Sequence, residues 1–503
     1  MSRVSNVIRN STYGLSFLVL SVVLNFFSRK IFLEQLGSEF LGLFSTITVV
    51  VAFISVVEFG VKQSMLSTLY PMVSSGDNEN IVKTLNVMAS LYRYVIRIFL
   101  FISIMMILPL YLAFSKLNID FSTVLFLFSA LVISSLSEFR ISHKSVMFYV
   151  EQRNYIITRV VQSIGLLKVL FQIILVYYPQ SYYTWISCII ISSLIHAVYV
   201  NYEFNKSYSH LKINRNIKIK EIYGKEVDFI KKIKSLNVHR LSGLMMVNSG
   251  TLYFYWFSSL TDVAMVGNYT LIFNSVAMIL TILNSSIAPS VGSVISENDK
   301  SKSLLIYFRL NRIRIMVATL SSCGFMFYTE LFIREWLGES YVLSSTVLYL
   351  MILNLSITTF RDSMNNFIEG YGLFGDTKTP IIEIIVNTIL SVFLGMIYSI
   401  EGVLLASVIT NAMMGFVLKP HYVFKYGFNI NINEFYYSLA KSILLYSIFV
   451  VPVFFIASFV EFYSLKDYII ASVSFMSFVV FSYICILYYK EPFVRSKIKD
   501  YIK

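Results

Sequence analysis

The stretch GLLKVLFQIILVYY, residues 165–178, places the cation of Lys168 inside an apolar run suited to a membrane. Arg159 precedes it by nine residues, and the pair Tyr177–Tyr178 follows it by about ten. At about 1.5 Å of rise per residue, Lys168 lies roughly 13–15 Å from each, near the middle of a hydrocarbon layer about 30 Å thick. A cation at that depth costs about 2.5–3.5 kcal/mol on insertion scales. Lys168 therefore needs a buried partner, a water-filled cavity or an anionic cargo, and we interpret it as lining a cavity.

Four more charged residues stand near the ends of apolar runs. Arg29 and Lys30 mark the outer end of the first run; snorkelling or pairing with Glu34 explains them, and the alternative is a place at a cavity rim. Arg361 ends the tenth run, where it could face the mouth of the cavity. Glu383, near the start of the eleventh, either binds a coupling cation or pairs with Arg361.

Glu58 is four residues from Lys62, which favours an ion pair at a helix end, with ion coupling as the alternative. The candidate substrate-binding residues are therefore Lys168, Arg29, Lys30 and Arg361. The candidates for coupling to H⁺ or Na⁺ are Glu383 and Glu58. We expect no other cofactor, no metal site and no catalytic residue.

The motifs of the common enzyme classes are absent from the sequence. There is no GxxxxGK[ST] loop, no HExxH, no nucleophile elbow and no paired-carboxylate motif. No predicted outer loop is long enough to hold a sugar substrate outside the membrane, and no segment resembles a channel filter. A secondary transporter, and not an enzyme, is the class that remains.

The composition is that of a helical membrane protein. Of 503 residues, 56% are apolar and only 14% charged, against about 25% charged in soluble proteins, and the mean hydropathy is +0.70. The net charge of +13 is spread over loops, so nucleic-acid binding is not expected.

Fourteen apolar runs are long enough to be spans. With the N-terminus inside, 34 of the 41 lysines and arginines fall on the inner side and 5 on the outer side, which supports an even number of spans with both termini cytoplasmic. The predicted spans are 12–33, 39–61, 86–114, 121–142, 155–178, 183–204, 237–259, 263–291, 314–333, 341–361, 380–400, 402–418, 436–459 and 468–489.

The spans divide into two sets of six and a final pair. We predict an N-lobe at 1–204 with helices 1–6 and a C-lobe at 237–425 with helices 7–12. The basic cytoplasmic loop 205–236 between them is either a helix lying on anionic phospholipid or a plain tether. Residues 426–503 hold helices 13 and 14 and a cytoplasmic tail. The matching triplets Gly42-Leu43-Phe44 and Gly267-Asn268-Tyr269 suggest parallel repeats.

Six stretches of the sequence resemble one family. The residues that carry the likeness are FSRKIFLEQLGSEFLGLFSTI, VEFGVKQSMLSTLYPMVSSGDNENI, MVGNYTLIFNSVAMILTILNSSIAPSVG, LFIREWLGESYVL, RDSMNNFIEGYGLFGDTKTPIIEIIVNTILSVFLG and EGVLLASVITN. They resemble the bacterial oligosaccharide flippases of O-antigen and capsule synthesis, in the MATE-like MOP exporter superfamily. The sequence differs from the family in the seventh span. Relatives often carry an acidic residue there, whereas this sequence reads VNSGTLYFYWFSSL, which is uncharged.

The resemblance implies an all-α membrane protein of about 14 helices, with two six-helix lobes around a cavity and two further helices. It implies a flippase that moves undecaprenyl-diphosphate-linked oligosaccharide to the outer leaflet of the bacterial inner membrane. Anionic phospholipid at the cytoplasmic face and polysaccharide polymerase or chain-length proteins would be its partners. The alternatives are a MATE-type multidrug exporter and a polysaccharide polymerase or ligase.

Overall fold

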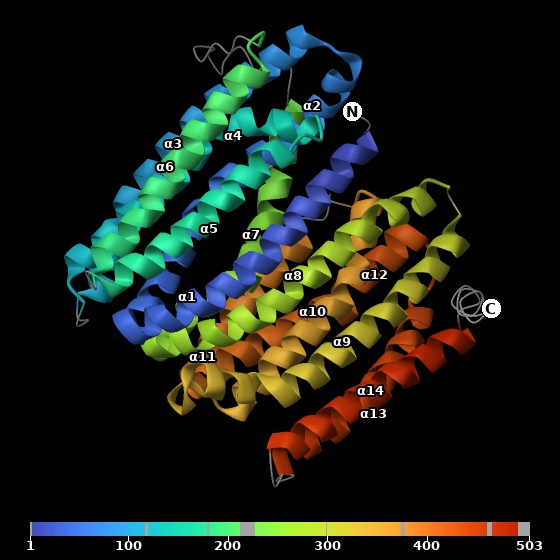
Figure 1. Cartoon of the computed structure of the whole chain (residues 1–503). Helices are drawn as coiled ribbons and strands as arrows, with labels where there is room; N and C mark the ends of the chain where they lie inside the picture. The colour runs from blue at the N-terminus through green and yellow to red at the C-terminus, as the bar shows by residue number, and fades with distance from the viewer. Residues whose placement is uncertain are drawn as a thin grey trace. The chain divides into compact units, whose positions relative to one another are not determined.

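The computed structural model describes residues 3–115, 119–178, 181–211, 227–297, 299–373, 378–459 and 465–490, and the regular structure among these residues is all helical (Figure 1). Nine of the described helices are long and apolar enough to cross a membrane. The helices are α1 (Arg3–Ile54), α2 (Val56–Ser75), α3 (Asn78–Phe114), α4 (Phe121–Val150), α5 (Tyr155–Tyr177), α6 (Tyr182–Ser207), α7 (Val227–Phe257), α8 (Leu260–Ser296), α9 (Lys300–Leu337), α10 (Ser345–Gly370), α11 (Lys378–Met413), α12 (Lys419–Val423), α13 (Asn433–Phe459) and α14 (Leu465–Lys490).

Two of these helices contain a sharp turn and so supply two predicted spans each. The turn in α1 is at Gly37, whose φ of 82° is readily available only to glycine. The turn in α11 is at Ser399. Just after this turn, Gly402 lies close to the first half of α11: a Cβ on Gly402 would stand 2.0 Å from the Leu394 carbonyl oxygen. Since α2 continues the second half of α1, and π-helical turns join α11 to α12, the helices account for all fourteen predicted spans. The predicted fold class is confirmed.

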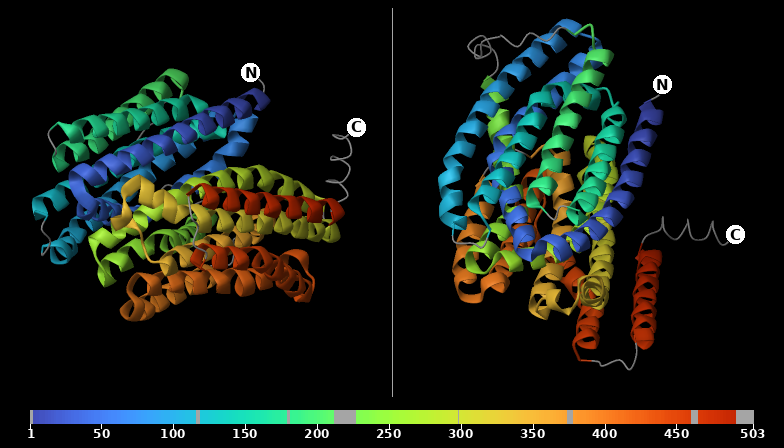
Figure 2. Two further views of the ribbon diagram at one scale, coloured as in Figure 1. Left: turned by 60° about the horizontal axis from the view of Figure 1, so that its bottom comes forward. Right: turned by 60° about the vertical axis from the view of Figure 1, so that its left-hand side comes forward.

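The chain forms two compact units, residues 1–264 and 265–503. In the first unit α5 packs between α1 and α6, α4 packs against α6, and α7 packs against α2 and α1 (Figures 1 and 2). The predicted division at the loop 205–236 stays a prediction, and residues 212–226 of that loop lie outside the described residues. The predicted cytoplasmic tail after Lys490 also lies outside them.

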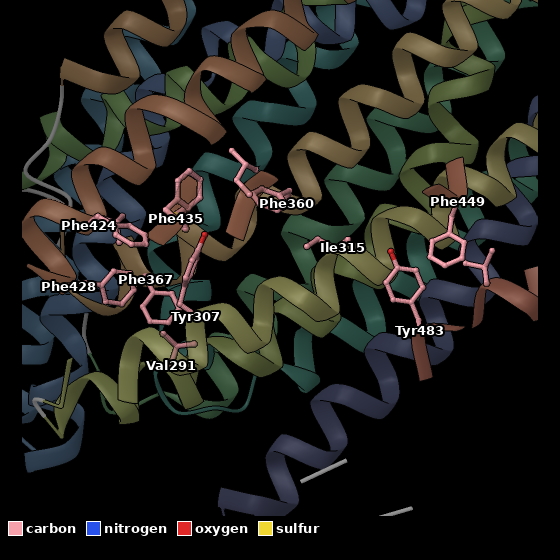
Figure 3. Close-up of a cluster of buried hydrophobic side chains, with 14 residues drawn as sticks. Val291, Tyr307, Ile315, Phe360, Phe367, Phe424, Phe428, Phe435, Phe449 and Tyr483 are labelled. Carbon is pink, nitrogen blue, oxygen red and sulfur yellow. The ribbon is translucent and has the colours of Figure 1, made fainter. Parts of the chain in front are cut away.

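A cluster of buried aromatic side chains forms the core of the second unit (Figure 3). Tyr307 of α9 is fully buried against Phe367 of α10 and against Phe424 and Phe428, which follow α12. Phe360 is seven residues before Phe367 and points into the same cluster. Because seven residues are about two helical turns, this contact fixes which face of α10 is turned inward.

Candidate functional site

Lys168 lies in the middle of α5, half-buried, among side chains that are mostly apolar. Within the part of the chain that the structure describes, no carboxylate comes within 4 Å of its ammonium and no side chain accepts a hydrogen bond from it. The described residues therefore leave this cation without a fixed negative partner.

Aromatic contacts between α1 and α6 mark the depth at which Lys168 lies in the first unit. The rings of Phe32 on α1 and Trp185 on α6 meet at 5.0 Å, and Gln172 Nε2 on α5 donates to the Trp185 carbonyl oxygen at 3.2 Å. Lys168 is one turn before Gln172, on the side away from the end of α5.

Arg29 lies at the same level on α1. Arg29 is three residues before Phe32. The turn of α1 at Gly37 lies beside the connection between α5 and α6, because the ring centroids of Phe40 and Tyr182 are 4.2 Å apart. Counted at 1.5 Å per residue, Arg29 is about 12 Å from its turn and Lys168 about 14 Å from the end of α5. Two cations from two adjacent helices thus share one depth.

The two predicted rim residues differ in their surroundings. The Nη1 atom of Arg29 is buried with no hydrogen-bond partner among the described residues, whereas Lys30 is exposed. Neither forms an ion pair with Glu34 in the described ranges. The predicted alternative of pairing with Glu34 is therefore not present among the described residues.

The predicted ion pair of Glu58 with Lys62 is wrong. Glu58 accepts a hydrogen bond of 2.5 Å from the Tyr92 hydroxyl of α3. Lys62 Nζ lies 5.5 Å from the ring centroid of Tyr149 on α4. The partners supplied by the neighbouring helices replace the contact along the helix, which is worth only about 0.2–0.5 kcal/mol.

A polar pocket of about 190 Å³ lies within the first unit, between α2, α4, α5 and α6. Three hydrophobic side chains line it, and the rest of its lining is polar or charged. The polar residues that matter below are Lys62, Glu138, Ser145, Asn154, Gln162 and His196.

In the second unit the two charged candidates contact each other. Arg361 Nη1 on α10 lies 2.7 Å from Glu383 Oε1 on α11 and donates to Asn411 Oδ1, also at 2.7 Å. The exposed fractions of the two charged side chains are 13% and 4%. Asn411 in turn donates to Asn354 at 2.7 Å, and Gly415 leaves room for the Arg361 stem, 3.3 Å from where a Cβ would stand. Of the two alternatives for Glu383, the structure contains the ion pair.

Two further cations belong to the same end of α10. Arg314 of α9 lies 3.5 Å from Asp362 and donates to the Thr359 carbonyl oxygen at 3.2 Å. Lys419 of α12 donates to Asn365 Oδ1 at 2.8 Å. These contacts join α9, α11 and α12 to α10. The cations of the second unit named here thus have fixed partners, whereas Lys168 and Arg29 have no acidic neighbour in the described part of the chain.

The polar pocket was missed at the sequence level, although its signal is present. Asn154, Thr158 and Gln162 recur every four residues along α5 and so form a polar stripe on one helical face. Glu138 and His196 lie inside predicted spans, where ionisable side chains mark functional sites by default. The spacing along α5 would have found the pocket.

Comparisons with known proteins define the fold class. No protein-family model matches the chain, and no curated protein matches it. Solved structures do: the lipid II flippase MurJ in an inward closed conformation aligns with a TM-score of 0.66 and 16% identity, over 95% of this chain and 98% of that one. The chain therefore shares its fold with this lipid II flippase, and the predicted resemblance is confirmed at the level of fold.

Two other solved structures, both described as MOP superfamily transporters, share the fold as well. An inward-facing multidrug resistance MATE family transporter aligns with a TM-score of 0.58 and 15% identity, over 83% of this chain and 98% of that one. A MOP superfamily transporter from Pyrococcus furiosus, for which a reversed polarity of the binding pocket suggests a different function, aligns with a TM-score of 0.56 and 12% identity, over 84% and 97%. This chain is thus a multi-pass membrane protein with the fold of transporters.

Proposed function

We propose that this protein is a flippase that moves an undecaprenyl-diphosphate-linked oligosaccharide from the cytoplasmic to the outer leaflet. The observation that carries the proposal is the pair of cations Lys168 and Arg29, at one depth in the first unit and without an acidic partner among the described residues. A fixed cation inside a membrane protein is favoured where it meets a mobile anion. The diphosphate of such a cargo is an anion of this kind.

The physical task of a flippase accounts for this arrangement. A diphosphate and its sugars would lose their water in hydrocarbon without replacement. Lys168 and Arg29 replace part of that water through charge-assisted hydrogen bonds to the phosphate oxygens. The polyprenyl tail stays in the bilayer while the two lobes rock about the head group, which gives alternating access. Lys30 and Arg361 stay candidates for further cargo contacts.

The setting follows from the predicted topology and the resemblance. The protein lies in the bacterial inner membrane with both termini cytoplasmic and delivers repeat units for O-antigen or capsule synthesis. The polymerase and chain-length proteins that use these units are its partners, and the basic loop 205–236 rests on anionic phospholipid. A proton or sodium gradient supplies the coupling, with Glu383 and Glu58 as the candidate sites.

The second candidate is a MATE-type multidrug exporter, which the multidrug transporter among the neighbours favours. One observation supports the flippase over it. Lys168 and Arg29, the two cations at one depth in the first unit, disfavour cationic drugs.

The test is transport by the purified full-length protein in proteoliposomes. The substrates are a fluorescent undecaprenyl-diphosphate oligosaccharide and, in parallel, a cationic dye. Flipping of the lipid-linked oligosaccharide above the level of protein-free vesicles, with no dye uptake, is the expected result. Dye transport without flipping would assign the protein to the multidrug class, and extension of the sugar chain would assign it to the polymerases.

A further inference from the structure

We infer that the polar pocket of the first unit binds one uncharged sugar residue of the cargo, while Lys168 binds its phosphate. The inference rests on the proposed function and adds a second contact point to it. The pocket lies wholly within the first unit, between four helices that are otherwise largely apolar.

The pocket offers the hydrogen-bonding groups that sugar hydroxyls need. The Gln162 amide makes no hydrogen bond within the described part of the chain, so it can both donate and accept. The Asn154 Oδ1 atom is buried with no partner among the described residues, while its Nδ2 donates to Thr158 at 2.9 Å. The Ser145 hydroxyl donates to the Ser142 carbonyl oxygen and keeps its lone pairs free to accept. A buried acceptor without a donor costs about 1–3 kcal/mol, which a hydroxyl donor removes.

The charges of the pocket favour an uncharged ligand. Lys62 and Glu138 lie on different helices, and over the described residues they form no ion pair with each other. His196 lines the pocket from a third helix. The two formal charges cancel, so a carboxylate on the ligand would be attracted by Lys62 and repelled by Glu138. A neutral sugar meets a donor on one wall and an acceptor on the other.

The geometry of α5 connects the pocket to Lys168. Val161 lines the pocket and is seven residues before Lys168, so the two side chains leave α5 on the same face. Their separation along the helix is about 10 Å, about the length of two linked sugar rings. A cargo whose phosphate lies at Lys168 therefore places its second or third sugar at the pocket. A cavity of about 150 Å³ holds one six-membered ring, so the volume of about 190 Å³ suits a single sugar ring.

The experiment compares two substrates that differ only in the number of sugars. The full-length protein in proteoliposomes is given a polyprenyl diphosphate with one neutral sugar or with three. In the pocket variant Gln162→Leu with Ser145→Ala, flipping of the three-sugar substrate should fall about three- to tenfold, the loss of one or two hydrogen bonds. Flipping of the one-sugar substrate should change less than twofold, because that substrate does not reach the pocket.

Two control variants separate the possible outcomes. Ser163→Ala is the matched control, since its hydroxyl is bonded to the Arg159 carbonyl oxygen and does not line the pocket. It should leave both substrates unchanged, whereas Lys168→Ala should lower flipping of both. Thermal unfolding of each variant in detergent checks that its fold is intact.

Several results would overturn the inference. Equal loss for both substrates, or a changed pH profile for both, would make the pocket part of the coupling machinery instead. Faster flipping when the outer two sugars are uronic acids would contradict the neutral assignment. If the unaltered protein flips neither substrate, the proposed function fails and the sugar site fails with it. Flipping that is sensitive to Lys168→Ala but indifferent to the pocket variant overturns the sugar site alone.

Discussion

Arg361 and Glu383 form a buried ion pair of 2.7 Å that joins α10 to α11 in the second unit, and Asn411 accepts a second hydrogen bond from the same guanidinium. Both charges are therefore satisfied inside the protein. Any ion that binds Glu383 must compete with Arg361. The second unit thus neutralises these charges with fixed partners, whereas the described part of the first unit leaves Lys168 and Arg29 for a mobile one.

Breaking this ion pair from one side should destabilise the protein strongly. Glu383→Gln leaves Arg361 buried without its counter-charge, which costs about 3–5 kcal/mol. Removing both charges in Arg361→Met with Glu383→Gln should recover most of that loss. Chemical unfolding in detergent measures the difference, and Arg334→Gln is the control, because its exposed bridges to Glu330 and Glu339 contribute at most about 1 kcal/mol. If the double variant were as unstable as Glu383→Gln, the loss of stability would not come from the unpaired charge of Arg361, and this prediction would be wrong.

The two glycines of the suggested repeat should differ in their tolerance of a side chain. A Cβ on Gly42 would stand 1.8 Å from the Leu260 carbonyl oxygen, whereas a Cβ on Gly267 meets nothing within 4 Å. Gly42→Ala must displace backbone and should lose about 1–3 kcal/mol or more. Gly267→Ala should keep or raise the melting temperature, since alanine is favoured over glycine within a helix. Similar melting temperatures for the two variants would refute the close contact at Gly42.

Much of the fold follows from sequence, because hydropathy and lysine and arginine counts report directly on the lipid environment. Each of the fourteen predicted spans falls on a described helix, and nine of the described helices are long and apolar enough to cross a membrane. The candidate site was predicted less well, because the partner of a charged residue depends on how helices pack. Glu58 contacts Tyr92 on α3 instead of Lys62 on its own helix. Glu383 and Arg361, which lie on successive helices near one connection, were within reach of sequence reasoning.

Arg29 and Lys30 offer a matched test of whether burial marks the cargo site. Arg29→Ala removes a half-buried cation at the depth of Lys168 and should lower the flipping rate about tenfold or more, as expected for a charge-assisted contact worth about 1.5–3 kcal/mol. Lys30→Ala removes an exposed cation next to it in the chain and should change the rate less than twofold. Initial rates in proteoliposomes measure both. A stronger effect of Lys30→Ala would move the cargo contact from the half-buried side of α1 to its exposed side.

The most direct test is the flipping rate of Lys168→Ala for an undecaprenyl-diphosphate oligosaccharide, measured beside Lys168→Arg and Lys441→Ala. Lys441 is the control because it is exposed on α13, 3.9 Å from the ring centroid of Tyr437. We predict that the flipping rate of Lys168→Ala is at least tenfold lower than that of the unaltered protein. Lys168→Arg should keep a measurable part of the rate because the charge remains, and Lys441→Ala should leave the rate unchanged. An undiminished rate in Lys168→Ala, at normal protein level and stability, would contradict the central claim that this cation meets the cargo.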